Sequence, residues 1–157
     1  MSAPTPSLKV IATNRKASHD FHIHERVEAG MVLVGSEVKS LRDAKATLVD
    51  GWVEFKRGEA WLHGLAINEY PWANRFQHQV DRVRKLLLNK AEIRKLAVKT
   101  EQRGYTLIPL QLYFKDGRAK VELGLVTHKK QHDKRAAKRE ADDKREIARA
   151  TKGERVA

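Results

Sequence analysis

The 157-residue sequence contains no cysteine, which excludes disulfides, thiolate zinc sites and cysteine nucleophiles. It has no apolar run near the roughly 18 residues that a membrane-spanning helix needs, and its first ten residues lack the apolar core of a secretory signal. The phosphate-loop pattern GxxxxGK[ST] and the zinc-hydrolase pattern HExxH are also absent. We therefore expect a cytoplasmic protein that is not an enzyme and has no metal or other cofactor.

Positive charge is what the sequence has in excess. Lys and Arg number 32 against 20 Asp and Glu, a formal net charge of +12. Up to Thr127 there are 21 basic and 14 acidic residues, and after it 11 and 6, so both parts are basic. A field of this sign attracts polyanions, and nucleic acid is the first partner to consider. An anionic membrane surface is disfavoured because the basic tail has no broad apolar face.

The chain divides into three parts. Residues 1–13 carry Pro4 and Pro6 before any periodic pattern and predict a flexible N-terminal lead. Residues 14–127 are long enough for one domain with its own core. Residues 128–157 form a basic tail in which Ile147 is the only large aliphatic residue besides the penultimate Val. Such a tail cannot form a core, so we expect it to be disordered when free and helical on a partner.

Hydrophobic periodicity predicts the first half of the domain. Alternating apolar residues from Phe21 to Val27 indicate a strand, and residues 31–34 a second one. Ser36 is then a suitable N-cap for a short helix. Residues 53–62 predict a hairpin with its turn at Arg57 and Gly58.

The second half begins with a loop over residues 68–79. Asn89 and Glu92 have capping-box spacing, which predicts a helix over 90–103 that stops at Gly104. Two strands follow around a turn at residues 115–117, with an edge or bulge at Pro109. The fold class is mainly β with α: a small closed antiparallel OB-like barrel of about six strands with two or three flanking helices.

The histidines raise the alternative of an enzyme or a metal site. His22 and His24 share one face of a strand, but no further ligands converge with plausible spacing. His19 and Asp20, adjacent on a strand, would point to opposite faces and could not act as base and orienting carboxylate. Basic residues mixed with aromatic ones in "PWANRF" and "NRKASH" favour RNA instead, since bases stack on rings and cations hold phosphates.

Several stretches together resemble one family. They are "NRKASHDF" (14–21), "VEAGMVLVGSEVKSLR" (27–42), "RKLLLN" (84–89), "KVELGL" (120–125) and "KKQHDKR" (129–135). In this order they are similar to the small protein B family, the tmRNA (SsrA)-binding proteins of bacterial trans-translation. The resemblance runs from about Asn14 to the C-terminus. It implies a monomeric, non-enzymatic adaptor that binds the tRNA-like domain of tmRNA.

The resemblance also implies site residues. The tmRNA-facing surface would consist of Asn14, Arg15, Lys16, His19, Glu28, Lys85, Leu87, Asn89 and Lys120. Lys supplies phosphate contacts, Asn offers a donor and an acceptor, and Glu can accept from a base or a 2′-hydroxyl. For Leu87 a place in the core is an equal alternative.

For the tail, the resemblance implies the ribosome as partner, with elongation factor Tu reached indirectly through tmRNA. His132 would stack on a base of the decoding centre, beside Lys129, Lys130, Asp133, Lys134 and Arg135 on small-subunit rRNA. A helix carrying Lys144, Arg145 and Ile147 would dock in the empty mRNA channel.

Three positions depart from the family pattern. His128 stands where a Gly is common, which reduces backbone freedom between domain and tail. Ser18 replaces an Arg and removes one expected phosphate contact. Ala148 replaces a second large apolar residue after Ile147. Two rival hypotheses remain: a generic basic OB-like module for single-stranded RNA or a ribosomal site, and a metal-independent ribonuclease using His19 or His132.

Overall fold

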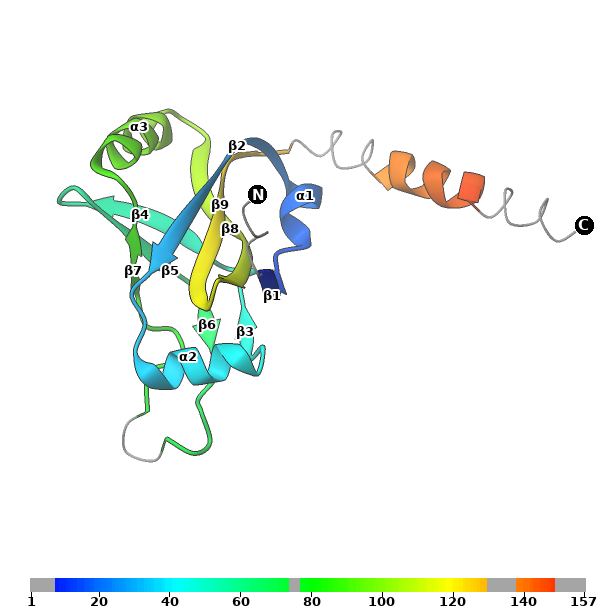
Figure 1. Ribbon diagram of the computed structural model, residues 1–157. Coiled ribbons are helices and arrows are strands. Elements are labelled where there is room, and N and C mark those ends of the chain that lie inside the picture. Colours follow the sequence, from blue (N-terminus) through cyan, green and yellow to red (C-terminus); the bar gives the residue numbers. More distant parts are fainter. Residues whose placement is uncertain (1–7, 74–76, 130–137, 149–157) are drawn as a thin grey trace, which may run out of the picture.

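The computed structural model describes residues 8–73, 77–129 and 138–148, which are mainly antiparallel β-strands with helices around them (Figure 1). The strands are β1 (Leu8–Thr13), β2 (Phe21–Met31), β3 (Ala46–Thr47), β4 (Trp52–Lys56), β5 (Glu59–His63), β6 (Ala66–Ile67), β7 (Arg84–Leu87), β8 (Tyr105–Lys115) and β9 (Arg118–His128). The helices are α1 (Lys16–Asp20), α2 (Gly35–Arg42) and α3 (Lys90–Glu101). Residues 138–148 are also helical. None of the helices in these ranges is long and apolar enough to cross a membrane.

Seven strands form one sheet in the order β1-β8-β9-β2-β7-β5-β4, and β3 pairs with β6 apart from it. The edge strands β1 and β4 do not pair with each other, so the sheet is not closed by hydrogen bonds. Gly51, just before β4, lies so close to Pro109 of β8 that an added Cβ would collide with the proline ring. The sheet therefore curls until the start of its edge strand β4 packs against β8, the strand next to the opposite edge. The predicted closed barrel of six strands is not confirmed, since the described residues contain nine strands and an open ladder.

Both predicted hairpin turns are confirmed. Arg57 and Gly58 have φ of 53° and 74°, and Asp116 and Gly117 have φ of 50° and 79°. Two consecutive positive φ angles match the right-handed twist of the flanking strands. The register also shifts between Pro109 and Gln111, which is the irregularity that the proline predicts.

Two bulges allow the long strands β2 and β8 to contribute residues to two apolar clusters. The main core contains fully buried residues that are distant in the sequence, such as Leu41, Leu62 and Leu123. A smaller cluster packs Ala17 of α1 against Val126 and its neighbours. The register of β2 shifts between Ile23 and Glu25, and that of β8 shifts after Pro109. Because a shift of one residue moves side chains to the other face, these bulges turn apolar residues toward α1.

Other sequence predictions of element boundaries are wrong. Residues 8–13 are not part of a flexible lead but form β1, which pairs with β8. Residues 21–31 form one strand instead of two, since the β2 ladder continues through Gly30. Strands β3, β6 and β7 were not predicted. The loop over residues 68–79 contains no helix or strand in the residues that the structure describes.

Helix caps also differ from expectation. Helix α2 begins at Gly35 after Val34, and Ser36 Oγ lies 2.8 Å from His78 Nδ1 instead of capping the helix. Asn89 does precede α3, but its side chain makes no capping hydrogen bond, so the predicted capping box does not form. The helix ends at Glu101, two residues before the predicted end, and Gly104 follows with φ of 88°.

Candidate nucleic-acid interface

Three of the predicted RNA-facing residues meet around Gly30. In the ladders of β2, Gly30 pairs with Lys120 on one side and with Leu87 on the other. An added Cβ on Gly30 would lie 3.6 Å from Lys120 Nζ and 3.3 Å from Leu87 Cβ, so both side chains pass over the glycine. Glu28 lies two residues earlier on the same face of β2. Because Leu87 is 54% exposed, it lies outside the core.

Tyr113 holds Glu28 in place. Tyr113 pairs with Lys120 in the β8–β9 ladder, and its hydroxyl donates to Glu28 Oε2. This hydrogen bond is the main reason that the pKa of Glu28 lies below its ordinary value, and Lys115 and Lys120 add electrostatic attraction. Burial and the neighbouring carboxylate raise the pKa of Tyr113. Glu28 is therefore a charged acceptor. We call Glu28, Leu87, Tyr113, Lys115 and Lys120 the sheet-face cluster.

Lys85 and Asn89 lie next to this cluster on β7 and at the start of α3. Lys85 Nζ is 3.2 Å from Glu59 Oε1, and both side chains are about 40% exposed. A surface ion pair of this kind contributes little, so a phosphate can compete for the lysine. The Asn89 side chain is exposed and leaves its donor and acceptor available, since it does not cap the helix.

The first predicted group, on and before α1, is only partly available. Arg15, Lys16 and His19 are exposed, but Asn14 is 7% exposed. Asn14 Nδ2 donates to Pro109 O at 3.1 Å. Its Oδ1 is the one buried side-chain nitrogen or oxygen of the described residues without a hydrogen-bond partner. Asn14 thus ties the start of α1 to β8, and its side-chain oxygen is shielded from an external partner.

This group adjoins the sheet-face cluster. A cavity of about 340 Å³ beside Asn14 is lined by Arg15, Arg26 and Glu122. Glu122 pairs with Glu28 in the β2–β9 ladder and accepts a hydrogen bond from Arg26 Nη1 at 2.7 Å. The two predicted groups are therefore neighbours on one face.

The prediction for His19 and Asp20 is wrong. They lie at the end of α1 and not on a strand, and His19 Nδ1 is 2.8 Å from Asp20 Oδ1. His22 and His24 are exposed, as expected, and His24 Nε2 lies 2.9 Å from Thr127 Oγ1. In the described part of the chain, no three His, Asp or Glu side chains converge on a possible metal site.

The start of the basic tail is attached to α1. The Lys129 backbone N–H donates to Asp20 O at 2.9 Å, and Lys129 Nζ donates to Ser18 O at 2.8 Å. The His128 ring packs on Phe21 with ring centres 4.5 Å apart. The other predicted decoding-centre residues, Lys130, His132, Asp133, Lys134 and Arg135, lie outside the described residues.

Residues 138–148 carry the predicted docking residues. All of them are exposed, including Lys144 and Arg145, and Ile147 is 67% exposed. Lys144 Nζ lies 3.5 Å from Glu140 Oε1, one helical turn earlier. The helical residues agree with the helix formers of the tail sequence. Disorder of the tail in the free protein stays a prediction.

A buried group of ion pairs holds β7, one of the strands of the interface, against α2. Glu37 and Arg84 are both fully buried, with Arg84 Nε 2.5 Å from Glu37 Oε2. Arg82 Nη2 donates to Glu37 Oε1 at 2.6 Å. Burial would raise the pKa of Glu37, but hydrogen bonds from Arg82 and Val34 N–H and the charge of Arg84 outweigh it, so the pKa is lowered. The group links α2 to β7, the strand that carries Lys85 and Leu87.

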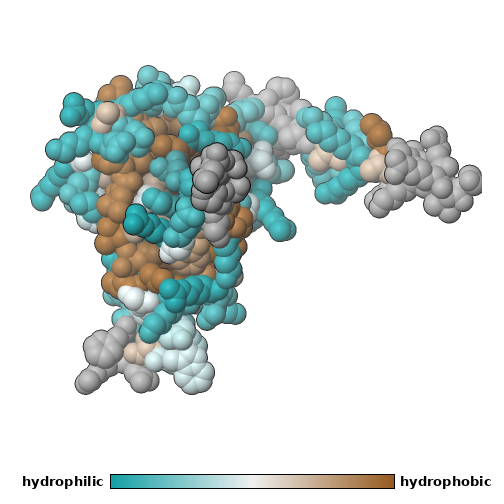
Figure 2. Space-filling view, in the orientation of Figure 1, coloured by the Kyte–Doolittle hydropathy of each residue, from teal (hydrophilic) through white to brown (hydrophobic). Residues whose placement is uncertain are grey.

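Sequence reasoning missed Tyr113 and Lys115, although a signal was present. Once the turn is placed at Asp116 and Gly117, counting back along the hairpin sets Tyr113 opposite Lys120. Exposed apolar residues near these side chains were also not predicted from the sequence. Figure 2 shows apolar residues gathered over the strands between α3 and α2. Two exposed apolar residues adjoin β7: Val83 immediately precedes it, and the Val32 backbone N–H donates to Lys85 O.

The curled sheet and its face of Lys, Arg, Asn and Glu side chains define a small basic β-domain whose charge suits a polyanionic partner. More particularly, the chain belongs to the SmpB family, because the family model described as "SmpB protein" matches residues 11–153.

Relatives agree with this family. The chain is 55% identical over 142 residues to the SsrA-binding protein of Geobacter sulfurreducens, which covers 90% of this chain and 93% of that protein. It is 54% identical over 147 residues to the SsrA-binding protein of Clavibacter michiganensis subsp. michiganensis, covering 94% and 93%. A solved chain from a study described as "tmRNA-SmpB: a journey to the center of the bacterial ribosome" is 45% identical with a TM-score of 0.66, covering 76% of this chain and 85% of that one.

Proposed function

We propose that the chain is an RNA-binding adaptor of trans-translation: it binds the tRNA-like domain of tmRNA and delivers it to stalled ribosomes. The names of its relatives and the tmRNA-SmpB study of the bacterial ribosome support this function. The observation that carries it is the sheet-face cluster, which gathers Glu28, Leu87 and Lys120 around Gly30.

The sheet-face cluster and the neighbouring Lys85 and Asn89 supply complementary chemistry for a folded RNA. Lys120 and Lys85 neutralise phosphates, and Asn89 donates to and accepts from a base edge. Glu28, oriented by the Tyr113 hydroxyl, accepts from an exocyclic amine or a 2′-hydroxyl. The exposed Arg15, Lys16 and His19 extend the contact beyond Glu122.

The tail is proposed to act on the ribosome. Lys129, Lys130, Lys134 and Arg135 would hold rRNA phosphates while His132 stacks on a decoding-centre base beside Asp133. Residues 138–148, with Lys144, Arg145 and Ile147, would enter an empty mRNA channel as a helix. Elongation factor Tu would act indirectly, through tmRNA. The adaptor would be a cytoplasmic monomer. Its OB-like barrel would be completed by side-chain packing between β4 and β8.

Sequencing the RNA that copurifies with the chain tests this function. We expect one dominant species with a tRNA-like acceptor end. Lys120→Ala should lower the magnitude of the slope of log affinity against log salt by about 0.7 to 0.9, one phosphate contact. A length-diverse mixture of RNAs would instead favour a generic RNA-binding module, and magnesium-free RNA cleavage abolished by His19→Ala would favour the ribonuclease.

A further inference from the structure

A groove borders the proposed interface at Lys85, Leu87 and Asn89. It runs between the β4–β5 turn, β7 and the first turns of α3, and its volume is about 650 Å³. Four cations line it, namely Arg57, Lys85, Lys90 and Arg94. The one carboxylate in its lining, Glu59, already pairs with Lys85. We call Arg57, Lys90 and Arg94 with this cavity the basic groove.

The three remaining cations of the basic groove are available for an anionic ligand. Arg57, Lys90 and Arg94 are all exposed, and no carboxylate of the described residues pairs with them. They come from two separate elements, the hairpin turn and α3, and face one cavity floored by the apolar residues of β7. A bound anion would therefore be held from both walls.

Arg57 is an unusual residue for its backbone conformation. Its φ of 53° lies in the left-handed region, at the turn position where Asn, Asp or Gly is preferred. The other hairpin of this sheet has Asp116 at the equivalent place. The turn itself gains nothing from an arginine, which points to a use for the side chain at the groove.

We propose that the basic groove binds backbone phosphates of a second segment of the same RNA that the sheet-face cluster holds. The proposal rests on the proposed function, since the groove also contains Lys85, Leu87 and Asn89 and so continues that interface without a break. Arg57 and Arg94 hold phosphate oxygens through their guanidinium forks, and Lys90 adds a point charge.

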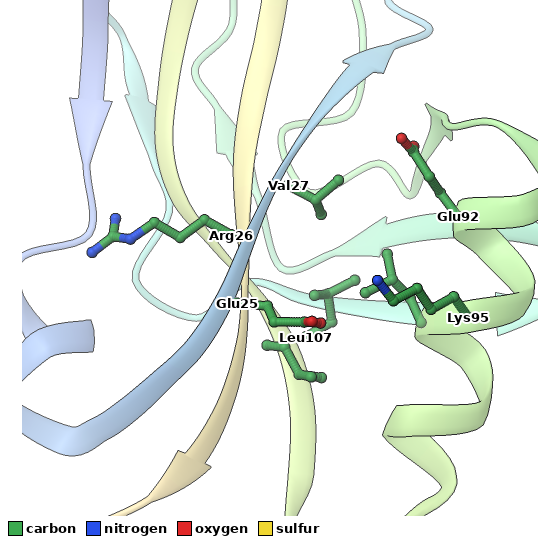
Figure 3. Close-up of a pocket in the computed structure, with 8 residues that line it drawn as sticks. Glu25, Arg26, Val27, Glu92, Lys95 and Leu107 are labelled. Carbon is green, nitrogen blue, oxygen red and sulfur yellow. The ribbon is translucent and has the colours of Figure 1, made fainter.

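The opposite side of α3 gives a matched comparison. There a cavity of about 290 Å³ lies between α3 and β2, and Figure 3 shows Glu25, Glu92 and Lys95 around it while Arg26 points away from α3. Lys99 Nζ donates to both oxygens of Glu25 at 2.6 Å. Acidic and basic groups balance on this side, so it does not favour phosphate. Lys95 is thus an exposed cation on the same helix as Arg94 but outside the basic groove.

The salt dependence of tmRNA binding tests the proposal with Arg57→Asn, Arg94→Ala and the control Lys95→Ala. We expect the first two to lower the magnitude of the slope by about 0.7 to 0.9 each, and the control to leave it unchanged. Arg57→Asn should also leave the thermal midpoint unchanged or raise it, because Asn suits the turn better. A loss of binding together with higher stability separates a ligand contact from a structural role.

Wild-type slopes in both groove variants would overturn the proposal, as would an equal decrease in Lys95→Ala. The latter would mean that general charge, not the groove, sets the affinity. A wild-type chain that binds tmRNA no better than a length-matched RNA would overturn the proposed function instead.

Discussion

Glu28 illustrates how single side chains prepare the face of the sheet. Its carboxylate is oriented by a hydroxyl from β8, two strands away, and attracted by Lys115 and Lys120. The pKa of Glu28 is lowered because the charged form accepts the Tyr113 hydrogen bond and faces Lys115 and Lys120. A charged, oriented acceptor can contact a base edge or ribose hydroxyl without first losing rotamer entropy.

Tyr113→Phe removes that orientation. We expect the pKa of Glu28 to rise toward its ordinary value, and the free energy of unfolding at pH 7 to fall by about 1.5 kcal/mol, the lower range for a hydrogen bond to a charged group. Because the folded-state pKa is depressed, this contribution is present above the unfolded pKa and is lost as pH falls through the folded pKa. NMR titration of the Glu28 carboxyl and denaturant unfolding at pH 7 would measure both effects.

Tyr105→Phe is the matched control for this change. Tyr105 contacts the His24 ring at 5.3 Å between ring centres, and no hydrogen bond from its hydroxyl stabilises Glu28. It should therefore leave the pKa of Glu28 unchanged. If Tyr113→Phe also leaves that pKa unchanged, the hydroxyl does not hold the carboxylate.

Among individual residues, the sequence predicted those that belong to short linear motifs. Glu28, Leu87 and Lys120 do meet, although their motifs are far apart in the chain. Tyr113 and Arg57 were missed because their neighbours come from pairing between strands. Asn14 lies mostly buried because it bonds to Pro109, a contact across 95 residues that no local pattern contains.

Helix α2 and strand β7 are joined by charge instead of by apolar contact alone. The carboxylate of Glu37 on α2 accepts hydrogen bonds from Arg84 of β7 and from Arg82 of the preceding loop. Arg84 Nη1 also donates to Leu65 O at 2.6 Å. Every group in such a buried network depends on the others for its hydrogen bonds. The position of β7, and with it Lys85 and Leu87, should depend on this network.

Glu37→Gln should therefore lower the free energy of unfolding by roughly 3 to 5 kcal/mol at pH 7, because Arg84 becomes a buried charge without a counter-charge. The affinity for tmRNA should fall as well. Since the pKa of Glu37 is lowered by folding, the stabilisation from the ion group is fully present above the unfolded pKa of about 4.3 and is lost as pH falls through the lower folded pKa. The difference between variant and wild type should thus shrink in acid.

Urea unfolding at pH 7 and at decreasing pH would test this, with Glu101→Gln as control. Glu101 is exposed at the end of α3, so its change should stay within about 0.5 kcal/mol. A loss below 1 kcal/mol for Glu37→Gln would show that water or a rearranged Arg84 replaces the carboxylate.

Elements with a clear turn signal were predicted well, and short ones were not. The hairpins around Arg57 and Asp116 follow from turn chemistry, and α3 from its apolar period. Strands β3 and β6 have two residues each, too few to show any period. Helix α1 has five residues and was not predicted, and His19 and Asp20 at its end were expected to lie on a strand. Pairing partners, not local propensity, determine these pieces.

The sheet order brings together segments that are distant in the chain. Strand β2 lies between β9 and β7, so residues near 30, 85 and 120 form one surface. The C-terminal end of β9 lies beside α1, where Lys129 bonds to Ser18 and Asp20. The tail thus leaves from the α1 side of the interface, and its attachment through His128 and Lys129 extends two residues beyond the predicted end of the domain at Thr127. A truncation that spares the interface must keep Lys129.

Truncation after Lys129 should accordingly leave tmRNA affinity within about twofold of wild type and abolish peptide tagging on stalled ribosomes. Ile147→Asp should cause part of that loss, since Ile147 is the only large apolar residue among 138–148. Ala141→Asp is the control, because it adds the same charge to the same helix on another side. The helical stretch of 11 residues spans about 16 Å at 1.5 Å per residue, enough to extend into a channel that message would otherwise fill. Tagging at the full rate by the truncated chain, equal losses for the two Asp variants, or a large loss of tmRNA affinity on truncation would each contradict separate roles for domain and tail.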